Sequence, residues 1–207
     1  MTQHDPALSA IAELRANVSV PFERAHAMPK SVYTSPAFAK AEEEHIFAQE
    51  WLCAGRADAL AKPGDYLTMN IAGEPVIILR DREGQLRGMS NVCRHRMSTL
   101  LEGRGNVRSI VCPYHAWTYN LDGSLRGAPA MARNEDFCRD DVKLPPVRVE
   151  DWQGWIMVTR NADAPPVAER LAGVDRLVGH LPMADYREVF REEFRWDTNW
   201  KVLAENF

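Results

Sequence analysis

The sequence predicts an α+β chain, in which an antiparallel all-β domain follows an N-terminal helical arm and precedes the start of an α+β domain. Residues 1–50 carry apolar side chains at helical spacing, and residues 51–165 carry short strand-like runs between turn signals. Residues 166–207 return to helical spacing and end without a stop signal. We therefore expect an arm, a complete β domain and the truncated start of a further domain, with these boundaries.

The arm is expected to contain two helices. The first is indicated by four apolar residues that share one helical face: Ala7, Leu8, Ile11 and Leu14. The second covers residues 35–51, where Ser35 suits the N-cap and Pro36 suits the first helical position. We expect the glutamates Glu42–Glu44 on its solvated side.

The β domain is predicted from strand-forming runs that alternate with turn signals. The expected strands cover residues 66–69, 75–79, 86–90, 107–111, 117–119, 124–126, 147–149 and 154–158. Turns at Ala72–Glu74, Asp81–Gly84 and Asn120–Gly123 connect neighbouring strands into hairpins. Such short strands with glycine-containing turns are typical of a small antiparallel barrel or sandwich. Beyond them, we expect a helix over 167–180 and a strand over 189–196.

Composition excludes several classes of protein. The 207 residues are 45% hydrophobic and 26% charged, as in a soluble globular protein, and the formal charge of −4 gives no reason to expect a nucleic-acid partner. No apolar run approaches the ~18 residues that a membrane span requires, and no secretory signal is visible. We therefore expect a cytoplasmic protein, in which Cys53 and Cys138 are free thiols.

One motif carries metal chemistry. Cys93-Arg94-His95 and Cys112-Pro113-Tyr114-His115 form the pattern C-x-H-x16-C-x2-H, so each half supplies one thiolate and one imidazole. Zinc and a Rieske-type [2Fe–2S] cluster both fit this ligand set. Structural zinc sites usually pair like ligands on each half, whereas a Rieske cluster has two Cys on one iron and two His on the other.

These ligands predict a role in one-electron transfer. We expect Cys93, His95, Cys112 and His115 to bind a [2Fe–2S] Rieske cluster, with a zinc-binding interaction module as the rival reading. Two ferric ions, two sulfides and two thiolates sum to zero charge in such a cluster, whereas four thiolates would make the sum −2. Because an electron is added more easily to a neutral cluster, histidine ligation raises the potential to roughly −150 to +300 mV. The loops contain no further Cys that could form a disulfide between them, which favours a Rieske centre of the lower-potential kind.

The same residues resemble a known family. The large (alpha) subunit of Rieske non-haem iron, aromatic-ring-hydroxylating oxygenases is resembled by two segments, Cys93–Arg96 and Cys112–Tyr119. The beginning of that family's catalytic domain is resembled by Asn199–Lys201 and Glu205–Phe207. The likeness covers nearly the whole chain. The family usually has Gly where Met97 and Ala116 stand. Neither departure replaces a ligand, although both lie in the loops.

The resemblance implies a terminal oxygenase component, a mono- or dioxygenase. In this family a reductase or ferredoxin passes electrons from NAD(P)H to the Rieske cluster, and a mononuclear non-haem Fe(II) then activates O2. The implied substrate is a small organic molecule, either an aromatic compound, as in aromatic hydrocarbon catabolism, or a methylated or quaternary amine. The family's two His and one carboxylate for that iron are absent from these residues, so we expect a fragment of a longer protein.

The resemblance also implies roles for single residues. His115 is the expected electron exit ligand, Trp117 the shield of the cluster, and Asn206 a catalytic residue near the missing iron. Arg94 and Arg96 are expected to face a neighbouring subunit or an acidic donor, and a homo-oligomer, a trimer, is implied. The alternative is a stand-alone Rieske ferredoxin-type carrier, although a carrier needs only the β domain.

Overall fold

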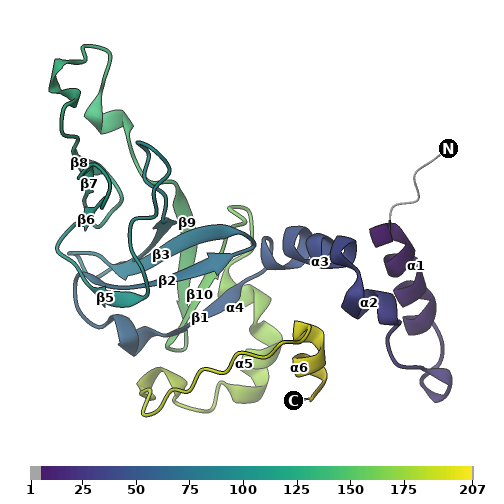
Figure 1. Ribbon diagram of the computed structural model, residues 1–207. Coiled ribbons are helices and arrows are strands. Elements are labelled where there is room, and N and C mark those ends of the chain that lie inside the picture. Colours follow the sequence, from purple (N-terminus) through teal and green to yellow (C-terminus); the bar gives the residue numbers. More distant parts are fainter. Residues whose placement is uncertain (1–5, 207) are drawn as a thin grey trace, which may run out of the picture. The chain divides into compact units, whose positions relative to one another are not determined.

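In the computed structural model, which describes residues 6–206, the β domain is built on a seven-stranded antiparallel sheet of order β1-β10-β9-β4-β3-β2-β5 (Figure 1). Its strands are β1 (Leu52–Arg56), β2 (Asp65–Ile71), β3 (Glu74–Arg80), β4 (Leu86–Ser90), β5 (Arg104–Asn106), β9 (Pro146–Trp152) and β10 (Trp155–Thr159). A second sheet contains β6 (Ile110–Val111), β7 (Thr118–Tyr119) and β8 (Leu125–Gly127). The predicted α+β class with an antiparallel β domain is confirmed.

Most of the predicted strands and turns are confirmed. Ala72 and Gly73, with φ of 47° and 83°, form the two-residue turn between β2 and β3, since both central residues of such a turn need positive φ. The predicted strand over 107–111 shortens to β6. The strand predicted over 189–196 is wrong, because this segment has no regular secondary structure and pairs with no strand in the described part of the chain.

Two strands escaped prediction. β1 contains Ala54 and Gly55, which are poor strand formers, and a bulge between Cys53 and Gly55 breaks its register with β10. β5 is three exposed residues with a central glycine. Both are held by their neighbours in the sheet rather than by their own composition.

Strand β3 is buried on both faces and thereby supports two cores. Alternate side chains of a strand point to opposite faces. Ile77 and Leu79 therefore pack with the residues around the cysteine–histidine loops, while Val76 and Ile78 belong to a second cluster that includes side chains of β2 and β10. All four side chains are at most 1% exposed. The strand thus packs directly against the residues that surround the site and links them to the second core.

The segment after β10 is fastened to the β domain by a buried arginine. The predicted helix over 167–180 is present as α4 (Val167–Arg170) and α5 (Ala172–Val178), separated at Leu171. Arg56 is only 6% exposed, and its guanidinium donates to the carbonyls of Met183 and Tyr186, both at 2.8 Å. It also lies 4.8 Å from the centre of the Trp155 ring. The short helix η6 (Met183–Asp185) follows α5, and the short helices η3 (Ala57–Leu60), η4 (Met131–Arg133) and η5 (Arg139–Asp141) lie between strands of the β domain.

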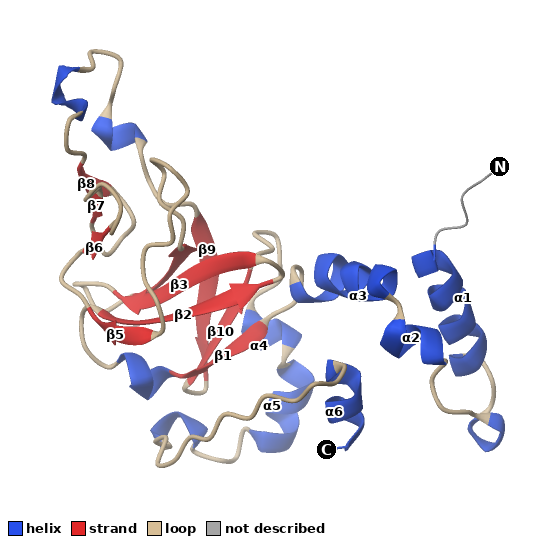
Figure 2. Cartoon of the chain, in the orientation of Figure 1, coloured by secondary structure: helices blue, strands red, loops and turns tan. Residues whose placement is uncertain are grey.

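The remaining residues form a helical unit. The chain divides into one compact unit over Ala48–Phe190 and another that joins the described residues up to Phe47 with those from Arg191 onward. In Figure 2 the strands of the first unit are red and the helices of both units are blue. The helices of the second unit are α1 (Pro6–Val18), η1 (Phe22–Arg24), α2 (Lys30–Thr34), α3 (Pro36–Glu42), the π-helical turn η2 (Glu43–Phe47) and α6 (Trp200–Asn206). No helix within residues 6–206 is both long and apolar enough to cross a membrane.

The arm helices begin as predicted, but one residue on them is placed differently. The Ser35 side chain accepts the Phe38 N–H and Pro36 begins α3, so the predicted cap is confirmed. The expectation that Glu42 is solvated is wrong, because its side chain is 6% exposed. Its partner is Lys201, whose ammonium lies 2.7 and 2.8 Å from the two carboxylate oxygens. Helical periodicity in the arm could not show a partner 159 residues away in the sequence.

Candidate metal centre

Two loops with the same backbone frame carry the four predicted ligands. The first runs from Cys93 to Ser98, between β4 and β5, and the second from Cys112 to Trp117, between β6 and β7. In the first loop the Cys93 N–H donates to the Ser98 carbonyl at 2.8 Å, and the Met97 N–H donates back to the Cys93 carbonyl at 3.1 Å. These two bonds close the loop around its cysteine.

The second loop repeats these bonds at the same spacing. The Cys112 N–H donates to the Trp117 carbonyl at 2.8 Å, and the Ala116 N–H donates to the Cys112 carbonyl at 3.0 Å. The fifth residue of each loop is in the left-handed region, with φ of 56° at Met97 and 57° at Ala116. These are the two positions where the sequence departs from the glycine usual in the family it resembles. Glycine suits them because it carries no Cβ to clash at positive φ.

Glycine at these positions is therefore expected to stabilise the chain. We expect Met97→Gly and Ala116→Gly each to raise the free energy of unfolding by roughly 0.5–1 kcal/mol. The reason is that the backbone strain relieved in the folded state is larger than the entropy that glycine adds to the unfolded chain. Urea unfolding followed by circular dichroism measures this. The matched control is Ala61→Gly, where φ is −78° and the same change should be destabilising. Destabilisation at all three positions would show that the left-handed residues are not strained.

The structure places the thiols inside and the imidazoles outside. Cys93 and Cys112 are 1% and 3% exposed, whereas His95 and His115 are exposed at the loop tips. The two imidazole rings lie 4.8 Å apart between centroids at 72°. The two cysteines are thus together inside and the two histidines together outside, although each loop carries one cysteine and one histidine.

The surroundings of Cys112 favour its thiolate form. Burial alone would raise the pKa of the Cys112 thiol, but hydrogen bonds from the backbone N–H groups of Tyr114 and His115 and from the side chains of Cys93 and Ser98 lower it below its usual value. A thiolate is the form in which cysteine binds metals. The hydrogen bonds to its sulfur therefore favour the form of Cys112 that binds a metal cation.

The surroundings of His115 favour its neutral form. Desolvation by neighbouring atoms, followed by the charges of His95 and Arg96, lowers the pKa of the His115 imidazole. Because a lowered pKa keeps the ring unprotonated to lower pH, His115 is neutral over a wider pH range than an isolated histidine. Neutral imidazole is the form that can bind a metal.

Tyr119 is a further residue of the site to which sequence reasoning gave no role. Its side chain is fully buried, and its hydroxyl lies 3.3 Å from the Cys93 sulfur. The Arg94 N–H donates to the hydroxyl oxygen at 3.0 Å, which leaves the phenolic proton for the sulfur. Burial and the neighbouring Cys93 raise the pKa of Tyr119, so the proton is retained. The only signal in the sequence is that Tyr119 ends the motif that begins at Cys112.

Aromatic side chains flank the histidines. Trp117 is 5% exposed and stacks on His95, with the ring centroids 4.8 Å apart and the planes at 8°. Phe137 meets Trp117 edge-on, with the ring centroids 5.6 Å apart. Tyr114 lies 3.7 Å from His115 between ring centroids. These rings cover part of each imidazole.

Of three other predicted residues, two lie on the first loop and one lies elsewhere in the chain. Arg94 and Arg96 have exposed side chains on the first loop. Asn206 is the last residue of α6, in the other compact unit. The positions of these residues neither support nor contradict the roles that the resemblance implies.

The arrangement fits a two-iron cluster better than a single zinc ion. A structural zinc site needs four ligands around one ion, whereas a Rieske cluster needs only two protein ligands on each iron. A pair of buried thiols and a separate pair of imidazoles meet the second requirement.

Known proteins are similar to this chain in sequence and in fold. A family model described as the Rieske [2Fe-2S] domain matches residues 50–151. Over 207 aligned residues the chain is 34% identical to the carnitine monooxygenase oxygenase subunit of Acinetobacter baumannii, covering 97% of this chain and 55% of that protein. The chain spans about half the length of the curated relatives it matches.

Solved structures agree with this likeness. The chain matches a crystal structure of the quaternary ammonium Rieske monooxygenase CntA with an inhibitor at a TM-score of 0.80 and 36% identity, covering 86% of this chain and 50% of that one. It matches naphthalene 1,2-dioxygenase from Rhodococcus sp., bound to indole, at a TM-score of 0.81 and 28% identity, covering 100% of this chain and 48% of that one. Both matches extend beyond the metal loops.

Proposed function

On the premise that this chain belongs to the Rieske oxygenases, in which it corresponds to the half that contains the Rieske [2Fe–2S] domain, we propose that it delivers electrons within a terminal oxygenase component. The observation that carries the proposal is the pair of loops with one backbone frame, each of which presents one cysteine inward and one histidine outward. This geometry suits a cluster that takes protein ligands from two sides.

Four side chains would hold the cluster that a Rieske domain implies. Cys93 and Cys112 would bind the inner iron as thiolates, and His95 and His115 would bind the outer iron as neutral imidazoles. When bound, the cluster supplies the transfer of one electron at a time. The lowered pKa values of Cys112 and His115 support these protonation states.

Neighbouring residues would set access to this centre. Trp117, stacked on His95, excludes water from one side of the histidine pair. His115 has an exposed ring and would be the exit for electrons toward a mononuclear iron. Tyr119 would hold the Cys93 sulfur by its hydroxyl.

For the whole protein we propose the role of the family's large subunit. A reductase or ferredoxin would supply electrons, and a mononuclear non-haem Fe(II), bound outside these residues, would activate O2. The large subunits would assemble as a homotrimer. We propose a methylated or quaternary amine as the substrate class, because the curated relatives at 32–34% identity over 91–98% of this chain include carnitine and glycine betaine monooxygenase subunits and a choline monooxygenase.

Cluster assembly tests the proposal directly. The purified chain, incubated anaerobically with ferrous iron and sulfide, is expected to become red-brown, to bind about two irons per chain and to give the electron paramagnetic resonance signal of a Rieske centre after reduction. Cys112→Ser should abolish all three, while Cys138→Ser should leave them intact. A colourless protein that binds only zinc would refute the proposal.

A second assay separates the oxygenase from a stand-alone carrier. The oxygenase that contains this chain is supplied with a reductase, NADH, O2 and a quaternary amine such as carnitine. Oxygenated product formed in step with O2 consumption supports the terminal oxygenase. Electron transfer to an external acceptor without such product would support the carrier.

Tyr119 is expected to tune the potential of the cluster. Tyr119→Phe removes a hydrogen bond to the Cys93 sulfur, which is stronger when the cluster carries the extra electron. If that difference is about 1 kcal/mol, the midpoint potential falls by roughly 40 mV. Protein-film voltammetry measures the change. Tyr66→Phe is the control, since its hydroxyl donates to the Glu102 carbonyl instead, and an equal shift in both variants would contradict the assignment.

A further inference from the structure

The Asn199-Trp200-Lys201 triplet plays no part in the cluster site, yet every member of it contacts the N-terminal arm. The Asn199 side chain caps α6, since its oxygen accepts the Lys201 N–H at 3.1 Å. Its amide nitrogen donates to the Tyr33 carbonyl at 3.0 Å. One side chain thus begins the helix and ties that beginning to α2.

Lys201 makes the strongest of these contacts. Its ammonium bonds both oxygens of Glu42, and both side chains are more than nine-tenths buried. The ammonium also lies 5.3–6.0 Å from the ring centres of Tyr33, Phe38 and Trp200. A buried ion pair is costly unless its geometry is good, and its best-attested use is to fix one arrangement of the elements that it joins.

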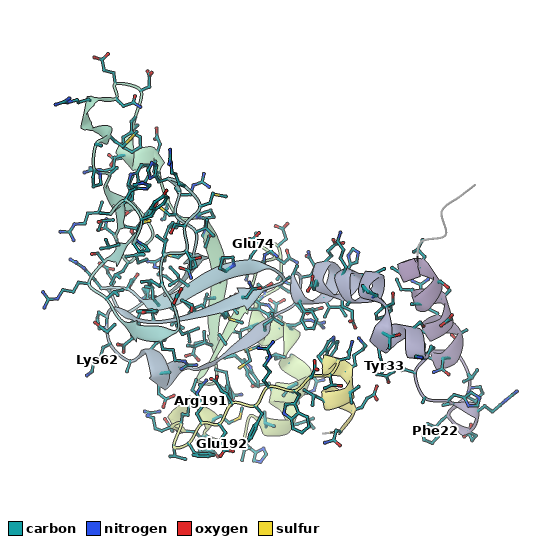
Figure 3. The ribbon with its side chains drawn as sticks, in the orientation of Figure 1. Phe22, Tyr33, Lys62, Glu74, Arg191 and Glu192 are labelled. Carbon is teal, nitrogen blue, oxygen red and sulfur yellow. The ribbon has the colours of Figure 1, made fainter. Side chains whose placement is uncertain are left out.

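Trp200 and Glu205 extend the contact along α6. The Trp200 indole N–H donates to Glu42 at 3.4 Å, and its ring meets Phe47 edge-on at 5.3 Å. One turn later, the Tyr33 hydroxyl donates to the Glu205 carboxylate at 2.6 Å. Tyr33, labelled in Figure 3, therefore contacts α6 near its end through Glu205, the residue before Asn206 in the sequence.

A helix as short as α6 needs such support. Its seven residues are too few for a stable isolated helix in water. Of its side chains, only that of Lys201 is buried. The orientation of α6 is therefore set by a few directed polar contacts to the arm, rather than by a broad apolar face.

We propose that the N-terminal arm is the platform that positions α6, with Tyr33 and Glu42 as the positioning residues and the Asn199–Lys201 triplet as their counterpart. Through Glu205 this contact sets the direction of Asn206. The proposal rests on the proposed function only in so far as Asn206 lies near the mononuclear iron. The physical contact between arm and helix is tested without any metal.

Amide hydrogen exchange of the 207-residue chain tests that contact. Tyr33→Phe removes one hydroxyl, and Asn199→Asp keeps the cap oxygen but removes the donor to the Tyr33 carbonyl. Each is expected to speed exchange in α6 by roughly threefold to tenfold while the β sheet keeps its wild-type rates. Tyr186→Phe, in the other unit, is the matched control and should change nothing in α6. Unchanged exchange in α6 for both variants would overturn the platform.

Steady-state kinetics test the positioning of Asn206. In the oxygenase that contains this chain, Tyr33→Phe should lower kcat several-fold per folded enzyme while KM and the cluster potential stay at wild-type values. A purely structural role would reduce the amount of folded enzyme but not its kcat. Faster exchange with unchanged kcat would overturn the link to Asn206. A wild-type enzyme without oxygenase activity would refute the proposed function instead, and the exchange rates would still decide the platform.

Discussion

Replacing His115 with cysteine is expected to lower the midpoint potential of the assembled cluster by roughly 100 mV or more. The change exchanges a neutral imidazole for a thiolate and adds one negative charge to both oxidation states. Adding an electron then costs more. Clusters with four cysteine ligands lie near −400 mV, whereas Rieske clusters lie at roughly −150 to +300 mV, so one replaced ligand should cover part of this gap.

Protein-film voltammetry on reconstituted protein measures this shift, and iron analysis verifies that a cluster has formed. Cys138→Ser is the control, because this exposed thiol lies outside both loops and its replacement should leave the potential unchanged. An assembled His115→Cys cluster with the wild-type potential would mean that His115 is not a ligand.

Lys201→Met is expected to destabilise the helical unit by roughly 3–5 kcal/mol, because it leaves the Glu42 carboxylate buried and unpaired. Glu42→Met/Lys201→Met removes both charges and fills the same space with apolar atoms. Its free energy of unfolding should lie much closer to that of the wild type, since a buried ion pair can be replaced by apolar residues at little net cost.

Urea unfolding followed by tryptophan fluorescence compares the two variants, with Trp200 as the reporter nearest the pair. Lys40→Met is the control, since its partner Glu44 is 3.7 Å away and both side chains are more than half exposed. Loss of such a surface pair should cost less than about 1 kcal/mol. If the double variant were as unstable as Lys201→Met, the unpaired carboxylate would not be the cause.

The β domain was predictable because its hairpin turns are indicated by residues adjacent in the sequence. Turns such as Asp81–Gly84 and Asn120–Gly123 end in glycines with positive φ of 77° and 87°, a requirement that is written in the sequence. β1 and β5 were missed because their pairing comes from partners far along the chain. The segment 189–196 was overpredicted for the same reason, since β composition does not supply a neighbouring strand.

The candidate site shows the same division. The spacing of the cysteines and histidines was sufficient to group Cys93 with Cys112 and His95 with His115. The role of Tyr119 depends on β7 placing its hydroxyl beside a sulfur 26 residues earlier, which no local pattern reports. Glu42 was misplaced on the surface because its partner is on α6, and the sequence shows neither the contact nor the aromatic rings around it.

The distance in sequence between Glu42 and Lys201 has a consequence for the synthesis of the protein. At about 5–20 residues per second, the 159 residues between them take the ribosome roughly 8–32 s to add. Throughout that interval the arm has been made but its partner helix has not. The β domain, whose strands are contiguous in sequence, can fold while the arm still exposes Phe38 and the Glu42 carboxylate. The pairing of α6 with the arm therefore has to wait until the β domain between them has been made.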